Sequence, residues 1–482
     1  MFGRVHFALR IFFTTSIGGG QGMKNCFIKH YVYMAACALA CMAPLAAKPN
    51  WTMLVFVQAN NNLSSFAMQN FNDMAMIGST ENLTTLVQWY QPNKPGIWRY
   101  KIELGRMVLD ECIGTNDPHA DGTTTNELVD AMRWAVNKYP ANQYSLVLWN
   151  HGIGIIDPVW GKMRPWQVHQ PRLGLAQEIV RDNQRIQLVN LAEAVDTPLA
   201  GLTDNTATTT CCLLDYVISD TRGILFNEQS RRYMDNASLC SALTTIKTDV
   251  LNNQKIDLLG MDACLMAMLE VGYLAKDAAK ILVASQEVEL ARGWNWLEVV
   301  TMMNVAKTTP SSIGEAIVSS FETLYKNRIP FYTQSAINLD GMDPIRESID
   351  AVINTYNQCK TDNKTKMHDI IRKARHSCQR FSSQNYIDLH SFLAEIQKHL
   401  EEQLEAGSIK KLRVYNDLQA AITICQNRIE STVIASVAGQ NLARARGLSI
   451  YFPAGRIDES YPLTAFAQES QWHNFLKDFL HA

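Results

Sequence analysis

Short runs of apolar and β-branched residues alternate along the chain with segments whose apolar residues recur at helical spacing. The apolar runs lie at residues 53–57, 83–89, 145–149, 256–261 and 281–284. Helical spacing is clear at residues 63–76 and 126–138. This alternation predicts an α/β fold with a mainly parallel sheet that is covered by helices on both faces. In such sheets functional residues gather at the carboxyl ends of the strands, so the residues directly after each strand are the first candidates.

The pattern divides the chain into three further parts after an N-terminal segment. Residues 48–342 carry the alternation of strands and helices and predict one domain, with a long polar loop at about 155–220. Residues 343–440 have helical spacing and predict a helical region. Residues 441–482 contain the apolar run 447–453, which predicts a strand returning to the first sheet, and then a C-terminal helix.

Residues 23–47 have the layout of a secretory signal peptide. Lys24 and Lys29 precede an apolar run from Tyr31 to Ala43, and small residues follow up to Ala47. The run is shorter than the roughly 20 residues that a membrane span needs, so we expect cleavage near Ala47 and no permanent membrane span. The predicted location is therefore secreted or periplasmic.

Two features of the N-terminal segment leave alternatives open. Cys37 and Cys41 each follow small residues, so a lipid anchor at one of them is the alternative to simple cleavage. Residues 1–22 precede Met23, and we interpret them as an upstream extension of the reading frame. We exclude residues 1–47 from the predicted fold.

Composition and charge narrow the class of protein. The chain has 482 residues, of which 47% are hydrophobic and 19% charged, as in ordinary globular proteins. Its 44 Lys and Arg residues are balanced by 46 Asp and Glu residues, so no nucleic-acid partner is expected. Eleven cysteines are too dilute for a disulfide scaffold, and no C-x-x-C pair suggests a zinc site or a redox dithiol.

A histidine and a cysteine follow two of the predicted strands. His151 and Gly152 come directly after the strand at 145–149, and Cys264 comes after the strand at 256–261. If these strands are neighbours in a parallel sheet, their ends meet at one edge and the pair can act as nucleophile and acid/base. A cysteine thiolate is stabilised beside an imidazole and at a helix N-terminus, where we expect Cys264 to lie.

The pair predicts hydrolysis of an acyl bond. His151 would protonate the leaving amine, and the N–H groups of Gly152 and Cys264 would form an oxyanion hole, since glycine has no Cβ to block a substrate carbonyl. Taken singly, His151 is also explained as a strand-end histidine bonded to backbone, and Cys264 as a small buried apolar residue. No second pair of ligands accompanies them, so we expect no metal.

The residues around this pair resemble a known family. His-Gly after one strand and Ala-Cys after the next is the pairing of caspase-like cysteine peptidases, and the wider sequence resembles the clostripain family. The segments that carry the resemblance are Trp51–Val57, Asn60–Leu63, Leu148–Gly152, Met261–Ala267, Val283–Ser285, Gly293–Trp296 and Gly447–Pro453. The resemblance implies a caspase-like sheet and a secreted or periplasmic endopeptidase that cuts after Arg or Lys through a thioester and activates itself by internal cleavage.

The resemblance also implies roles for individual residues. Cys264 matches the family nucleophile, His151 its partner, and Asp262 an acidic residue that binds the basic P1 side chain. Asp262 lies two residues before Cys264, so a strand would turn both side chains to one face; capping of the following helix is the alternative role. Glu287 and Glu289, after the next strand, are second candidates for the P1 site. Some relatives use calcium, but nothing in this sequence supports a calcium site.

The chain departs from the family pattern at Ser285-Gln286-Glu287, where a second glutamate is expected in place of Gln286. The departure bears on the P1 preference rather than on the nucleophile.

The polar loop at about 155–220 contains basic residues that an enzyme with this preference would itself cut. The preferred sites are Arg172, Arg181 and Arg185, in the part with the weakest pattern. The alternative is an insertion without a regulatory role.

Two other classes of function remain open from sequence. The first is a catalytically silent binding or adhesion protein on the same fold, because fold does not imply activity. The second is a transpeptidase, which would pass the thioester to an amine. The expected partners of the leading hypothesis are proteins or peptides with a basic P1 residue.

Overall fold

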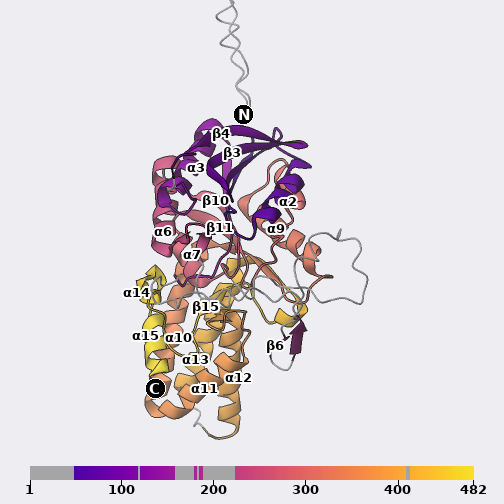
Figure 1. The fold of residues 1–482 in the computed structure, drawn as a ribbon. Coiled ribbons are helices and arrows are strands. Elements are labelled where there is room, and N and C mark those ends of the chain that lie inside the picture. Colours follow the sequence, from indigo (N-terminus) through magenta and orange to yellow (C-terminus); the bar gives the residue numbers. More distant parts are fainter. Residues whose placement is uncertain are drawn as a thin grey trace, which may run out of the picture. The chain divides into compact units, whose positions relative to one another are not determined.

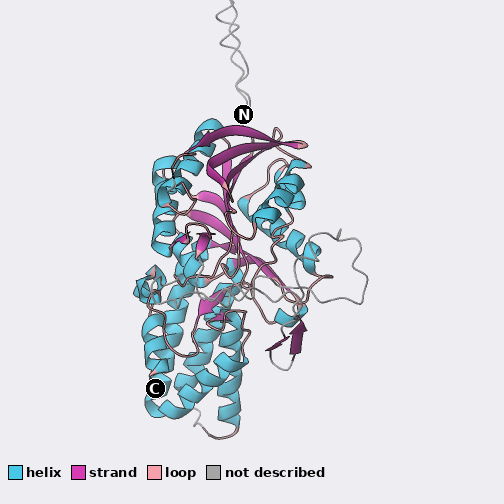
Figure 2. Cartoon of the chain, in the orientation of Figure 1, coloured by secondary structure: helices cyan, strands magenta, loops and turns pink. Residues whose placement is uncertain are grey.

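The computed structural model describes residues 48–117, 120–157, 178–181, 184–187, 223–408 and 413–481. The largest sheet in this part of the chain has nine strands (Figures 1 and 2). The strand order is β14-β12-β11-β10-β5-β1-β2-β3-β4. The bounds are β1 Trp51–Gln58, β2 Leu83–Gln91, β3 Lys94–Glu103, β4 Arg106–Ile113, β5 Gln143–Trp149, β10 Ile256–Asp262, β11 Ala279–Ala284, β12 Thr333–Asn338 and β14 Val433–Ala438.

The middle of this sheet is parallel, and its edges are antiparallel. Strands β11, β10, β5, β1 and β2 pair in parallel, while β12 and β14 extend one edge and β3 and β4 the other in antiparallel fashion. All eight residues of β1 are buried, as expected of a strand with both faces covered. The predicted mainly parallel α/β sheet is therefore confirmed, and the edge strands β3, β4, β12 and β14 are additions that the sequence pattern did not reveal.

Helices cover both faces of the sheet. On one face α3 packs on α6 and β1, and α6 packs on α7; on the other, α2 packs on α8, and α8 on α9 (Figure 1). Their bounds are α2 Ser64–Ala75, α3 Thr125–Lys138, α6 Asn236–Thr245, the π-helical turn η2 Ile246–Val250, α7 Leu269–Ala275, α8 Trp296–Met303 and α9 Pro310–Tyr325. Helix α3 begins with a capping box between Thr124 and Glu127, and α9 with Thr309 as the cap and Pro310 in the first turn.

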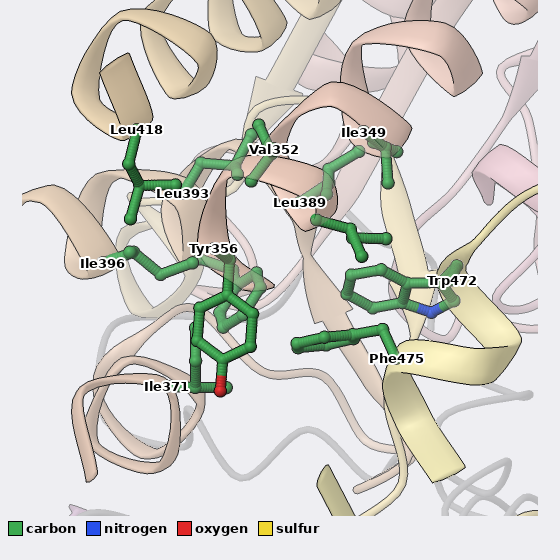
Figure 3. Close-up of a pocket in the computed structure, with 12 residues that line it drawn as sticks. Ile349, Val352, Tyr356, Ile371, Leu389, Leu393, Ile396, Leu418, Trp472 and Phe475 are labelled. Carbon is green, nitrogen blue, oxygen red and sulfur yellow. The ribbon is translucent and has the colours of Figure 1, made fainter. Parts of the chain in front are cut away.

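A bundle of helices follows the sheet, as the sequence predicted. Its members are α10 Met342–Asp362, α11 Lys364–Ser377, α12 Leu389–Glu405, α13 Arg413–Thr432 and α15 Trp472–Leu480. Figure 3 shows how apolar side chains of these helices meet, among them Tyr356, Leu393 and Trp472. The cavity that remains between them measures about 20 Å³. That volume holds about one water molecule, so the bundle interior is a packed core rather than a ligand site.

The run 447–453 does form a strand, but its predicted partner was wrong. Strand β15 (Ser449–Tyr451) pairs antiparallel with β13 (Tyr386–Asp388) in a separate two-stranded sheet. The central sheet is instead extended by β14, which occupies the edge beside β12. An apolar run indicates that a strand is buried without indicating which edge it joins, because register and partner depend on tertiary packing.

Short elements complete the described chain. They are β6 Glu178–Arg181, β7 Gln184–Gln187, β8 Ile224–Asn227, β9 Arg232–Met234, η3 Leu339–Gly341, η4 Gln440–Leu442, η5 Tyr461–Leu463 and α14 Ala465–Glu469. Strands β6 and β7 form an antiparallel hairpin inside the interval that the sequence pattern had left without structure.

Two groups of predictions lie outside the described residues. The proposed signal peptide at 23–47, with Cys37 and Cys41, belongs to the first, and most of the interval 158–222, with Arg172, to the second. Over the residues that are described, no helix has both the length and the apolar character needed to cross a membrane.

Candidate active site

The two strands that precede His151 and Cys264 are direct neighbours. Strands β5 and β10 pair in parallel, with Asp262 opposite Trp149 in the register. The backbone N–H of Asn150 continues the ladder to the carbonyl oxygen of Asp262 at 3.3 Å. His151 lies two residues beyond Trp149, and Cys264 lies two residues beyond Asp262. The histidine and the cysteine therefore occupy equivalent positions at one sheet edge, and both are buried.

Gly152 lies against the backbone of the cysteine turn. A Cβ atom at Gly152 would come within 2.5 Å of the carbonyl oxygen of Cys264 and 3.0 Å of the Met266 sulfur. Only glycine allows these two strand ends to approach so closely, since real Cβ atoms do not come that near a backbone atom. The predicted pairing of the two strand ends is thus supported by an independent contact.

Cys264 does not lie at a helix N-terminus, so that expectation was wrong. Helix α7 begins only at Leu269, and Cys264 lies in the turn that precedes it. Leu265 adopts a φ of 64°, a left-handed conformation that costs a leucine about 1–2 kcal/mol. The turn is held instead by the segment after β11: Leu265 donates to the Glu287 carbonyl at 3.1 Å, and Ala267 to that of Ser285 at 2.8 Å.

The same segment contacts the cysteine sulfur. The backbone N–H of Glu289 donates a hydrogen bond of 3.3 Å to the Sγ atom of Cys264. A fixed N–H donor at this position stabilises negative charge on the sulfur, which is the role that had been expected of a helix terminus.

His151 has a partner that the sequence analysis did not single out for chemistry. Its Nε2 atom lies 2.8 Å from the Oδ1 atom of Asn62, which follows β1. Asn62 belongs to the polar triplet Asn60–Asn62 directly after the first predicted strand. The rule that functional residues follow strands could have found it, but the triplet carries no nucleophile or ionisable group to draw attention.

Asp262 is buried and bound by the segment 293–296. Its Oδ2 atom accepts from the Trp294 backbone N–H at 3.3 Å and the Trp296 indole N–H at 3.1 Å. Gly293 has a φ of 67°, and a Cβ there would lie 2.4 Å from Asp262 Oδ1. The alternative in which Asp262 caps the next helix is excluded, because that helix begins seven residues later and these donors occupy the carboxylate.

Glu289 lies beside Asp262 and forms an acidic pair with it. Burial raises the pKa of Asp262 to about 6. Burial first, and the negative charge of Asp262 second, raise the pKa of Glu289 well above its ordinary range. Among the described residues no Lys or Arg side chain contributes to either shift, and Glu289 Oε2 has no N–H or O–H donor. The two carboxyl groups lie close enough to repel each other when both are charged, which favours retention of a proton by the pair.

Glu287, the other second candidate, faces away from this pair. Its carboxylate oxygens accept from the Ser382 backbone N–H at 3.0 and 3.1 Å, and one of them also accepts from Val288 at 2.8 Å. Glu287 therefore joins the segment after β11 to the loop before β13, and the structure brings Glu289 rather than Glu287 to Asp262.

Two of the three candidate cleavage sites lie in the described part of the chain. Arg172 lies outside the described residues. Arg181 ends β6 and Arg185 lies in β7, where it is the register partner of Val180. Both therefore have extended, paired backbone rather than the unstructured backbone that the sequence pattern predicted.

In the described part of the chain, no group of three or more His, Cys, Asp or Glu side chains is arranged to hold a metal ion. The site consists of a buried cysteine and histidine at matched strand ends with an acidic pair beside them. This combination on a mainly parallel α/β sheet defines the class of cysteine-dependent hydrolases.

Sequence comparison then identifies the family. The profile of the clostripain family, peptidase family C11, matches residues 55–197 and 213–479. The chain belongs to this family and is a cysteine endopeptidase. No curated protein matches the chain significantly.

Solved structures agree in fold. An inactive zymogen C11 protease from Parabacteroides distasonis has a TM-score of 0.52 and 16% identity, covering 90% of this chain and 99% of its own. A secreted C11 cysteine protease from Bacteroides thetaiotaomicron, in complex with an irreversible peptide inhibitor, has a TM-score of 0.53 and 16% identity, covering 88% and 99%. Another structure of a secreted C11 protease from that organism, "iotapain", has a TM-score of 0.53 and 14% sequence identity. The match covers 89% of this chain and 99% of that structure's chain. At these identities the likeness establishes the shared fold.

Proposed function

We propose that the protein is a secreted or periplasmic endopeptidase that cuts after Arg or Lys with Cys264 as nucleophile and His151 as acid/base. The observation that carries the proposal is the matched position of the two residues, each two places beyond a register pair of neighbouring parallel strands. Membership of the clostripain family supports the same chemistry.

The reaction proceeds by acyl transfer. The Cys264 thiolate attacks the carbonyl carbon of the scissile bond, and the N–H groups of Gly152 and Cys264 stabilise the oxyanion. His151 gives a proton to the leaving amine as the C–N bond breaks, which leaves a thioester on Cys264. A water molecule then attacks the thioester and transfers a proton to His151 as the C–S bond breaks, which releases the acid product and restores the Cys264 thiolate beside a protonated His151.

The acidic pair of Asp262 and Glu289 supports the preference for a basic P1 residue. A buried carboxyl pair that shares a proton holds less negative charge than its two groups can carry. An Arg or Lys side chain in the P1 site replaces that proton with a cation that both carboxylates attract. Arg has the advantage, because its planar guanidinium binds carboxylates with two parallel hydrogen bonds.

Maturation by internal cleavage completes the proposal. The interval 158–222 connects β5, which precedes His151, to β8 and onward to β10, which precedes Cys264. A cut at Arg172, Arg181 or Arg185 would release the chain beyond His151, while strand pairing in the sheet would hold the two fragments together. One C11 relative of the same fold is described as an inactive zymogen.

Export rests on the predicted signal peptide at 23–47 and on a relative that is a secreted C11 protease. N-terminal sequencing of the mature protein should find a residue near Lys48. Residue 24, or an earlier one, at the mature N-terminus would contradict cleavage there.

The experiment that tests the catalytic proposal uses peptides that differ only at P1. Wild-type enzyme should cleave the Arg and Lys peptides, and Cys264→Ala and His151→Ala should each lower turnover by about 1,000-fold or more without loss of fold. Retention of a tenth of the wild-type rate by either variant would contradict the assignment. The purified wild type should run as two bands on a denaturing gel, and Cys264→Ala as one; an active enzyme that stays a single chain would contradict self-processing.

A further inference from the structure

Asn62 contacts the side chain of His151 and has no part in the reaction described so far. It lies after β1, the neighbour of β5 in the sheet, so its backbone comes to the same edge as His151. We propose that Asn62 is a positioning residue that fixes the ring orientation and the tautomer of His151, which makes the site a Cys264–His151–Asn62 triad. The inference rests on the proposed role of His151.

The contact between the two side chains defines the tautomer. The Asn62 Oδ1 atom lies 2.8 Å from His151 Nε2. An amide oxygen only accepts hydrogen bonds, so Nε2 must carry the proton. Proton exchange with the sulfur and the leaving amine then falls to Nδ1. A partner on the far ring nitrogen is the general device that keeps a catalytic histidine in one orientation.

Asn62 is suited to this role because a buried network of amides holds its surroundings. The neighbouring Asn61 donates from its side chain to the Phe226 carbonyl at 3.1 Å and accepts from the Leu63 N–H at 2.9 Å. Asn150, the residue before His151, donates to the same Phe226 carbonyl at 3.1 Å and accepts from the Phe226 N–H at 3.0 Å.

The network therefore joins the ends of β1 and β5 through one residue of β8. The Asn150 side chain also donates to the carbonyl of Gln58, the last residue of β1, so the ends of β1 and β5 are joined directly as well. The backbones that carry Asn62 and His151 are thereby held as neighbours at the sheet edge, and the exposed Asn62 side chain reaches the histidine from this fixed backbone.

Asn62 carries no charge, and this distinguishes its role from that of a carboxylate. A carboxylate at the same place would stabilise the imidazolium, whereas an amide oxygen orients the ring with little electrostatic bias. Asn62→Asp should therefore keep the ring oriented but move the pH–activity profile to higher pH, because the added negative charge favours protonated His151.

The test compares full-length Asn62→Ala, Asn62→Asp and Asn60→Ala on one Arg peptide, measuring kcat and KM separately across pH. Asn60 is the matched control, since its side chain contacts Gln229 and not His151. Asn62→Ala should lower kcat by about 10–100-fold with KM within about twofold of wild type. Asn62→Asp should retain more activity than Asn62→Ala and show the shifted profile, and Asn60→Ala should match wild type.

The outcomes separate the two proposals. If His151→Ala is inactive while Asn62→Ala keeps wild-type kcat, the triad is overturned and the proposed function stands. If Cys264→Ala or His151→Ala stays active, the proposed function itself fails. A loss in Asn62→Ala that follows a lowered melting temperature would show a structural role only. If Asn62→Ala does not fold, the Asn62→Asp profile decides: a shift to higher pH supports the triad, and an unshifted profile overturns it.

Discussion

The backbone N–H of Glu289 donates to the sulfur of Cys264 while the side chain of the same residue pairs with Asp262. One residue thus contacts both the candidate nucleophile and the acidic pair proposed to bind P1. Because the segment 285–289 also holds the cysteine turn through Leu265 and Ala267, a change in the acidic pair is mechanically connected to the position of the sulfur.

Gly152→Ala should reduce activity and stability together. The new Cβ would lie 2.5 Å from the Cys264 carbonyl oxygen, a backbone atom that cannot move without shifting the cysteine turn. We expect kcat to fall by about 100-fold or more. The free energy of unfolding should decrease by about 1–3 kcal/mol, the usual cost of overpacking. Gly455→Ala is the control, because a Cβ at Gly455 meets no atom within 4 Å. Equal activity of both variants would contradict the close approach of the two strand ends.

Asp262→Asn should remove the preference for a basic P1 residue. Removing one partner of the buried charge pair between Asp262 and the P1 side chain should cost about 2–5 kcal/mol of binding free energy. The kcat/KM for the Arg peptide should therefore fall by about 30-fold or more. The rate on a Leu peptide should fall much less, so the selectivity between the two peptides should be lost. Glu289→Gln should have a smaller effect in the same direction, while unchanged selectivity in both variants would place the P1 site elsewhere.

The acidic pair also predicts a pH dependence. The pKa of Asp262 is raised from 3.8 to about 6, and that of Glu289 lies well above its ordinary range. Below about pH 6 the pair is mostly protonated, so KM for Arg peptides should decrease as pH rises through this value, while KM for a Leu peptide should not. A constant ratio of the two KM values from pH 5 to 8 would contradict the assignment.

The raised pKa values of Asp262 and Glu289 favour substrate binding at higher pH, but they lower the stability of the unliganded protein there. A carboxyl group whose pKa is raised on folding binds more protons in the folded than in the unfolded state, so stability declines as pH increases. The free energy of unfolding should therefore fall as pH rises from about 4 through 6. In Asp262→Asn this decline should be smaller, which thermal unfolding across pH would measure.

Gln286→Glu should loosen the segment that holds Cys264. The Gln286 side chain donates to Asp388 at 3.0 Å and accepts from the Gly447 N–H at 2.8 Å. Burial already raises the pKa of Asp388, so a second carboxyl group beside it would be repelled or protonated. We expect the free energy of unfolding to fall by about 1–3 kcal/mol at neutral pH and by less in acid. We also expect a lower kcat. Gln69→Glu on the exposed face of α2 is the control, and an equal response of both would contradict the role of this contact.

The sequence predicted the centre of the fold well because buried parallel strands have a strong local signature. The runs at 53–57, 145–149 and 256–261 became β1, β5 and β10, and the positions after them brought His151 and Cys264 together. The partner of the late strand could not be predicted in this way, because the short strand Ser449–Tyr451 does not encode which edge it joins.

The candidate site could be proposed from sequence where it contains reactive groups, whereas its neutral members gave no signal. Cys264, His151 and Asp262 carry chemistry that stands out after a strand. The choice of Glu289 over Glu287 depends on how the segment after β11 turns back onto the cysteine, which is a tertiary property. The start of α7 at Leu269 was missed because the apolar residues of the preceding turn are indistinguishable from a first helical turn.

The pairing of β5 with β10 has a consequence for the order of events in the life of the chain. About 100 residues separate the two strands in sequence, and contacts between such distant segments form late, after the entropy of closing a long loop has been overcome. A chain in which this pairing has not formed does not bring the cysteine and the histidine to one sheet edge. The proposed catalytic pair therefore exists only where β5 has joined β10, so an unfolded chain cannot carry out the proposed cleavage.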